Sequence, residues 1–82
     1  LSADMAWNSL MESYRNYAAS IKQLDAAMAY NKLIEKGYKE GINTFIETID
    51  ARNQLTTASL QLVINKYQLL AALATYEREI NK

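Results

Sequence analysis

The placement of helix-breaking residues is the feature that most constrains this chain. It contains no Pro, and its two Gly residues, Gly37 and Gly41, lie four positions apart near the middle. Pro breaks a helix interior and Gly weakens it, so the segments on either side of this pair are free to form long helices. Because half of the 82 residues are apolar, the pattern predicts an all-α fold rather than a sheet or a loop-rich domain.

The segment before the first glycine repeats its apolar positions every seven residues. One row consists of Trp7, Tyr14, Ile21 and Met28, and a second row consists of Leu10, Tyr17, Leu24 and the polar Asn31. Two such rows form the a/d seam of a coiled coil, so we expect a helix from about residue 2 to residue 36 that packs through both. Asn31 either sets the register, as buried Asn does in coiled coils, or is solvated near the helix end.

Residues 37–43 are expected to form a turn. Gly commonly ends a helix in the left-handed conformation, and we favour Gly41 as the break, with Gly37 alternatively inside the first helix. Thr44 followed by Glu47 fits a capping box, in which a hydroxyl and a carboxylate satisfy free backbone N–H groups at a helix start. The sequence therefore predicts an antiparallel two-helix coiled-coil hairpin.

The second helix is expected over residues 44–80, so that residues 1–82 form a single hairpin. Its apolar positions fall into three rows: Leu55, Leu62, Leu69 and Tyr76; Ile49, Val63 and Leu70; and Leu73 and Ile80. This stripe is broader than the seam of a helix pair, since a strict a/d seam is narrow. We therefore expect the second helix to contact neighbours on more than one side, through lateral assembly with other copies or chains.

Uncharged polar residues also recur along the second helix. They are Gln54, Thr57, Gln61, Asn65 and Gln68. They are expected on its surface, where they either line an aqueous duct or are exposed in the ordinary way.

Missing residue types exclude several functions. The chain has no Cys and no His, which excludes disulfides, thiol catalysis and Cys-based zinc sites and removes the commonest general base. Glu47 and Asp50 share one helix face, but acids in a first turn are explained by the helix dipole. We therefore expect no enzyme, no cofactor and no bound metal.

Charge and hydropathy limit the partners. Nine basic and nine acidic residues cancel, so the chain lacks the basic stripe that nucleic-acid binding needs. The most apolar stretch, residues 55–74, is interrupted by polar side chains and does not suit a membrane-spanning helix. Because the chain starts at Leu1 without Met, we expect a processed or excised piece of a larger protein.

The order of residues around the turn resembles a repeated signature of the TolC-like outer-membrane efflux proteins. The matching stretch reads Tyr38-x-x-Gly41-x-x-Thr44-x-x-Glu47-x-Ile49-Asp50-Ala51-x-x-x-Leu55-x-x-Ala58, and it continues in Leu62, Tyr67, Leu70, Leu73 and Tyr76. The acid-x-hydrophobe-acid-Ala part is more similar to the second, C-terminal repeat of that family than to the first.

This resemblance implies a fold and a function. The chain would be a periplasmic helical hairpin from a channel protein of the outer membrane of a Gram-negative bacterium, one stave of a periplasmic α-barrel. Three subunits would close a β-barrel in the membrane and the α-barrel beneath it. The channel would serve multidrug efflux or type I secretion by passive conduction, with energy supplied by an inner-membrane pump.

The resemblance also implies which residues carry the function. The tip, Gly41, Ile42, Asn43 and Thr44, would dock the periplasmic adaptor (membrane fusion) protein, which in turn contacts the pump. Tyr38, Glu47 and Asp50 would gate the entrance, the two acids as a ring of carboxylates that favours cations. Asn43 stands where the best-known member has a basic latch residue, so a charge-based latch is not expected here.

Two rival interpretations remain open from the sequence. An antiparallel hairpin that dimerises into a four-helix bundle explains the heptads and the absence of catalytic residues without the turn signature. The hairpin of a periplasmic adaptor protein also has long helices. The flanking sequence separates these interpretations: four long amphipathic strands indicate the channel, and a lipoyl-like β domain indicates the adaptor.

Overall fold

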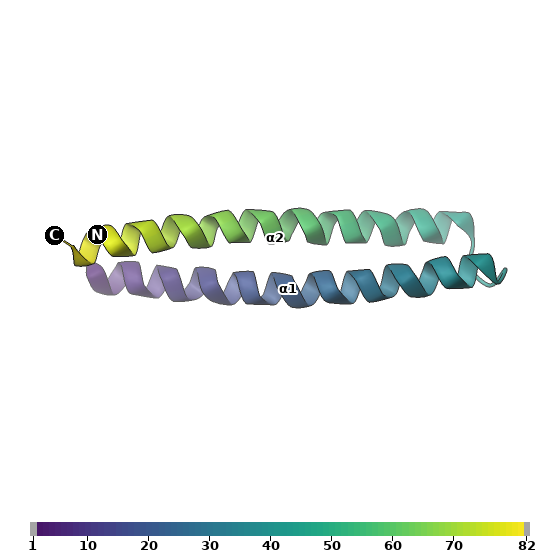
Figure 1. Ribbon diagram of the computed structural model, residues 1–82, viewed down its shortest axis with the longest axis horizontal. Coiled ribbons are helices and arrows are strands. Elements are labelled where there is room, and N and C mark those ends of the chain that lie inside the picture. Colours follow the sequence, from purple (N-terminus) through teal and green to yellow (C-terminus); the bar gives the residue numbers. More distant parts are fainter. Residues whose placement is uncertain (1, 82) are drawn as a thin grey trace.

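The computed structural model describes residues 2–81, which form two long helices side by side. Helix α1 spans Ala3–Lys39 and helix α2 spans Phe45–Ile80. The molecule is a rod of 62 × 13 × 13 Å, and the start of α1 and the end of α2 lie together at one end of it (Figure 1). The predicted all-α two-helix hairpin is therefore confirmed.

Helix α1 ends in a hydrogen-bonded Schellman turn with Gly41 at its centre. Gly41 adopts φ +78°, the left-handed conformation that an L side chain rarely takes. The Ile42 N–H donates to the Gly37 carbonyl at 2.7 Å, and the Gly41 N–H donates to the Tyr38 carbonyl at 3.1 Å. Gly37 is thus helical, and α1 runs to Lys39, three residues beyond the predicted end at residue 36.

Helix α2 begins with the capping box expected from the sequence. The Thr44 hydroxyl accepts from the Glu47 N–H at 3.2 Å, and the Glu47 carboxylate accepts from the Thr44 N–H at 3.1 Å. Ser2 caps α1 in a simpler way, because its hydroxyl accepts from the Met5 N–H at 3.2 Å. Both helices therefore start at residues whose side chains satisfy free N–H groups.

The seam of α1 differs from the predicted one in half of its positions. The row of Leu10, Tyr17, Leu24 and Asn31 faces α2, as predicted. The other inward row is Ala6, Ser13, Ser20, Ala27 and Ile34, whereas the predicted row of Trp7, Tyr14, Ile21 and Met28 is 41–57% exposed. The prediction of that row was wrong because the helices approach through small side chains, which leaves the bulky row beside the seam.

Helix α2 has the same division into a large and a small row. The predicted row of Leu55, Leu62, Leu69 and Tyr76 faces α1, and the small row consists of Ala51, Ala58, Asn65 and Ala72. The remaining predicted positions, Ile49, Val63, Leu70, Leu73 and Ile80, are 39–52% exposed. They are therefore exposed in the single hairpin, and their expected contact with neighbouring chains stays a prediction.

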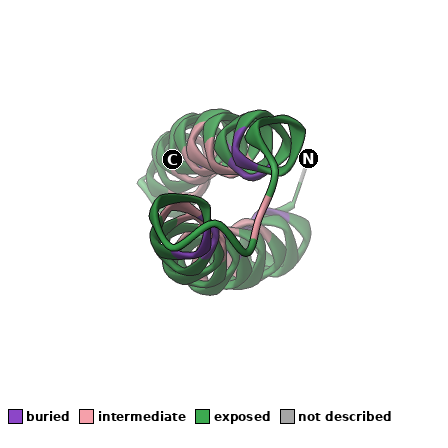
Figure 2. Cartoon of the chain, turned by 90° about the vertical axis from the view of Figure 1, so that its right-hand side faces the viewer, coloured by how far each residue is buried: buried purple, intermediate pink, exposed green. Residues whose placement is uncertain are grey.

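The core is thin for a chain of this hydropathy. Only four apolar residues are buried among those described, namely Ala6, Leu10, Ile34 and Ala51. Figure 2 shows that burial is confined to the facing sides of the two helices, while the outer sides are exposed. Large apolar side chains on those outer sides include Leu60 at 60% exposure and Tyr67 at 66%. A surface this apolar is typical of a chain that is covered by partners.

Candidate functional site

The hairpin tip combines a rigid turn with exposed apolar side chains. Of the predicted docking residues Gly41–Thr44, Ile42 is the most apolar and is 73% exposed. Phe45 and Ile46, in the first turn of α2, are 61% and 77% exposed. The residue pattern around the turn did not indicate these two residues as part of the tip, although the capping box at Thr44 places them at a helix start, before the seam begins.

Asn43 holds the turn against the end of α1. Its backbone N–H donates to the Gly37 carbonyl at 3.1 Å, and its side-chain amide donates to the Glu47 carboxylate at 2.9 Å. A Cβ atom at Gly37 would lie 1.7 Å from the Asn43 Oδ1 atom, so only glycine leaves room for this side chain. Asn43 therefore has a structural role in the turn.

Glu47 uses its carboxylate to cap α2. Its Oε1 atom accepts from the backbone N–H of Thr44 at 3.1 Å and from the Thr44 hydroxyl at 3.2 Å, and its Oε2 atom accepts from the Asn43 amide. The hydrogen bond from the Thr44 backbone, followed by those from the Asn43 and Thr44 side chains, lowers the pKa of Glu47 below its ordinary value of 4.5. Capping thus keeps this carboxylate ionised into the acidic range.

The capping role of Glu47 predicts a dependence of stability on pH. Because folding lowers its pKa, the contribution of Glu47 is complete above about pH 4.5 and is lost as the pH falls through the folded-state pKa. We expect the thermal midpoint of the wild-type chain to exceed that of Glu47→Gln at neutral pH, and the difference to shrink in acid. Circular dichroism melts across this range measure it.

A matched control separates the effect of losing the capping hydrogen bonds from the effect of losing one negative charge. Glu12→Gln removes one exposed carboxylate from α1 without touching the turn. A pH-independent difference between Glu47→Gln and the wild type would contradict the assignment.

Uncharged polar side chains gather on one side of the hairpin, which we call the glutamine face. It consists of Asn16, Gln23, Gln54, Gln61 and Gln68, which line two adjoining grooves between the helices. Glu47 lies seven residues before Gln54 in the same row of α2. Glu47, which was predicted to lie at the entrance, therefore extends the row of glutamines of α2 to the tip.

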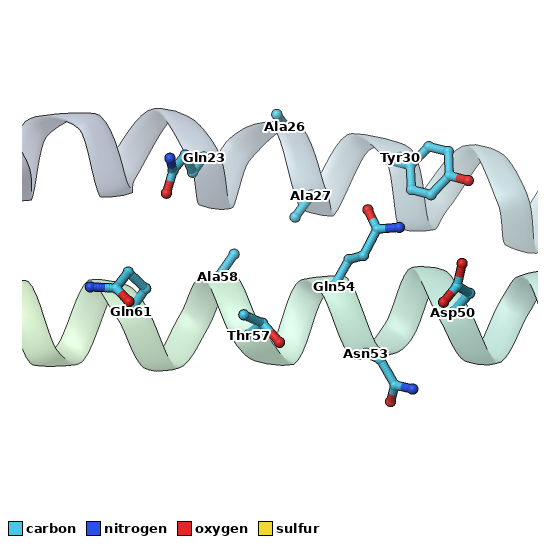
Figure 3. Close-up of a pocket in the computed structure, with 10 residues that line it drawn as sticks. All are labelled: Gln23, Ala26, Ala27, Tyr30, Asp50, Asn53, Gln54, Thr57, Ala58 and Gln61. Atoms are coloured by element: carbon cyan, nitrogen blue, oxygen red, sulfur yellow. The ribbon is translucent and has the colours of Figure 1, made fainter.

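Asp50 lines the larger of these two grooves. The groove has a volume of about 700 Å³ and includes the small side chains of Ala26, Ala27 and Ala58. Ala27 and Ala58 point toward each other between the helices, with Tyr30 and Asp50 at the end nearer the tip (Figure 3). The two predicted entrance acids thus lie on the side of the hairpin that carries the amides.

Tyr38 is not brought together with the two acids. Its ring packs against that of Phe45, with 6.1 Å between the ring centroids. It lines a different groove, together with Glu35 and Arg52, whose side chains form an ion pair at 3.5 Å. The three predicted gating residues therefore occupy two separate surfaces of one hairpin.

Asn65 is buried, contrary to the prediction that it lies on the polar surface. It is 9% exposed, and its amide donates to the Asn16 carbonyl at 3.1 Å and to the hydroxyl of Ser20, which is 1% exposed. Gln61 donates to the Asn65 Oδ1 atom at 2.9 Å. Its seven-residue spacing from Ala58 and Ala72 was the signal that places Asn65 in the small row.

The described residues present grooves between the helices and exposed apolar side chains on their outer sides. Within residues 2–81, no three His, Cys, Asp or Glu side chains are grouped so that they could hold a metal ion. In the same residues, neither helix combines the length and hydropathy that a membrane span requires. No protein-family model, curated protein or solved structure matches the chain.

Proposed function

We propose that this chain is the periplasmic hairpin of a trimeric TolC-like outer-membrane channel for efflux or type I secretion. The observation that carries the proposal is the division of its surface. The glutamine face carries uncharged amides, with Asp50 beside them in the larger groove, whereas the outer side of α2 exposes residues such as Leu60, Val63 and Tyr67. A hairpin in the wall of an α-barrel requires one surface that faces the water-filled duct and apolar surfaces that contact the adjacent hairpins.

In this proposal the glutamine face lines the duct. Amides offer hydrogen bonds to water and carry no charge that would trap an ionic substrate. Glu47 and Asp50, on the same side near the tip, would be repeated by symmetry as a ring of carboxylates at the entrance. Such a ring favours cations. The chain conducts passively, and an inner-membrane pump supplies the energy through the periplasmic adaptor.

The tip would dock that adaptor. Its hydrogen-bonded turn fixes the direction in which Ile42, Phe45 and Ile46 project, and these apolar side chains give a partner surface to bury. Tyr38, in contact with Phe45, would contribute to the contact between neighbouring hairpins that keeps the entrance closed. Docking opens the entrance only if the adaptor binds the open arrangement more tightly.

Conductance measurements test this proposal. The full-length protein that carries this chain is reconstituted in planar lipid bilayers, and cation-over-anion selectivity is recorded with and without Asp50→Asn. We expect the channel to conduct and the substitution to lower cation selectivity several-fold, because it removes one carboxylate per subunit from the entrance. Glu12→Gln, on α1, serves as the charge-matched control. A protein that forms no channel would overturn the proposal.

One observation favours a second function, an interaction module that pairs into a four-helix bundle. The row of Trp7, Tyr14, Ile21 and Met28 lies beside the seam and is 41–57% exposed. A face of this kind can be covered by a second hairpin stacked on the first. Sedimentation of the 82-residue chain distinguishes the two functions. A stable, discrete dimer of hairpins supports the interaction module. The absence of such a dimer supports the channel, because a hairpin of the channel wall depends on the rest of its protein for its neighbours.

A further inference from the structure

The contact between Asn65 and α1 differs from the other side-chain hydrogen bonds among the described residues of the hairpin. The side-chain hydrogen bonds at both caps join residues three or four positions apart. The Asn65 amide instead reaches α1, 49 positions away at Asn16 and 45 positions away at Ser20. Ser20 itself donates to the Asn16 carbonyl at 2.9 Å, so one carbonyl accepts from both side chains.

The repeated leucines of the seam do not define a unique pairing. Leu10 and Leu24 repeat on α1, and Leu55, Leu62 and Leu69 repeat on α2, each at multiples of seven residues. A shift of one heptad places leucines near leucines again, and so does pairing with a helix of another copy. Periodic seams of this kind are weakly specific unless a polar residue distinguishes one position.

Asn65 supplies that distinction because it is the one amide in a row of alanines. In the native register it faces Ser20. Because the two helices are antiparallel, Ala27, seven residues after Ser20, faces Ala58, seven residues before Asn65. If α2 slid along α1 by one heptad towards the tip, Asn65 would lie opposite Ala27. The buried amide would then be without its α1 partners.

We propose that Asn65, through its contacts with Ser20 and Asn16, selects the partner and the register of the two helices. It acts as a specificity device rather than as a source of stability, because a satisfied buried hydrogen bond adds little net stability, whereas the same amide without its partners is costly. This inference is independent of the proposed channel function. It concerns which helix pairs with which, a question for any assembly made from several such hairpins.

Disulfide trapping tests the inference, since the chain has no Cys of its own. Ala27→Cys with Ala58→Cys reports the native register, because both residues line the same groove. Ile34→Cys with Ala58→Cys reports the one-heptad shift that places Asn65 opposite Ala27, because both positions face the partner helix. Each pair is oxidised in air in the wild-type, Asn65→Ala and Gln68→Ala backgrounds, and intramolecular and intermolecular disulfides are separated on non-reducing gels.

We expect the wild-type and Gln68→Ala chains to close the native pair within one molecule and to leave the shifted pair open. Gln68→Ala removes an amide from the exposed glutamine face, so it controls for the loss of an amide outside the seam. In Asn65→Ala, which gives the small row of α2 the residue of its other positions, we expect at least a threefold loss of the native disulfide in favour of shifted or intermolecular ones. An unchanged disulfide pattern would overturn the inference. So would loss of helix in Asn65→Ala by circular dichroism, because Asn65 would then be needed for stability.

Discussion

Gly41→Val is expected to lower the free energy of unfolding of the hairpin by about 2 kcal/mol, because Gly41 adopts φ +78°. Placing an L residue in the left-handed region costs about 1–2 kcal/mol of conformational free energy, and a β-branched side chain raises this cost. No atom lies within 4 Å of a Cβ at this position, so the cost comes from the backbone and not from crowding. Urea denaturation followed by circular dichroism measures it.

Two further substitutions make the Gly41 prediction specific. Gly41→Asn is expected to cost less than Gly41→Val, because Asn tolerates the left-handed conformation better than other L residues. Gly37→Ala meets a different obstacle, the Asn43 side chain, and in an Asn43→Ala background it is expected to stabilise α1 by about 1 kcal/mol, the usual advantage of Ala over Gly within a helix. Equal effects of Val and Asn at position 41 would show that the backbone conformation is not the cause.

Ala51→Leu is expected to destabilise the hairpin by about 1–3 kcal/mol, the usual cost of overpacking a filled core. Ala51 is 0% exposed and belongs to the small row through which α2 approaches α1. A leucine there must push the helices apart or leave its preferred rotamer. With four buried apolar residues among those described, the hairpin has little stability to lose.

Ala71→Leu is the matched control for the prediction at Ala51. It makes the same substitution on the exposed side of α2 and is expected to change the free energy of unfolding by less than about 0.5 kcal/mol. Thermal melts of both variants, monitored at the same chain concentration, compare them. A larger loss at Ala71 than at Ala51 would contradict the assignment of Ala51 to the helix interface.

Local patterns were enough to predict the turn but not the whole seam. The left-handed Gly41 and the Thr44–Glu47 capping box depend on residues within a few positions of each other, and both occur as expected. The row of Trp7, Tyr14, Ile21 and Met28 was assigned to the seam because bulky apolar residues at heptad spacing usually form one. In the hairpin the small row of Ala6, Ser13, Ser20 and Ala27 takes that place.

The candidate site divides in the same way. The position of Glu47 at a helix start follows from its spacing to Thr44, and the shared side of Glu47 and Gln54 follows from helical periodicity. The separation of Tyr38 from Asp50 does not, because it depends on how α1 and α2 are rotated against each other. The burial of Asn65 depends on the same rotation, since only the approach of Ser20 and Asn16 covers it.

The sequence by itself determined that the chain forms two helices, that the break between them falls at Gly41, and how the second one starts. These features are fixed by backbone conformation and by hydrogen bonds between near neighbours, which each segment forms alone. Only the tertiary structure decided which faces of the two helices meet. Several rows on each helix are apolar enough to pack, and the choice among them depends on how closely two backbones approach, a property that neither helix possesses before it meets the other.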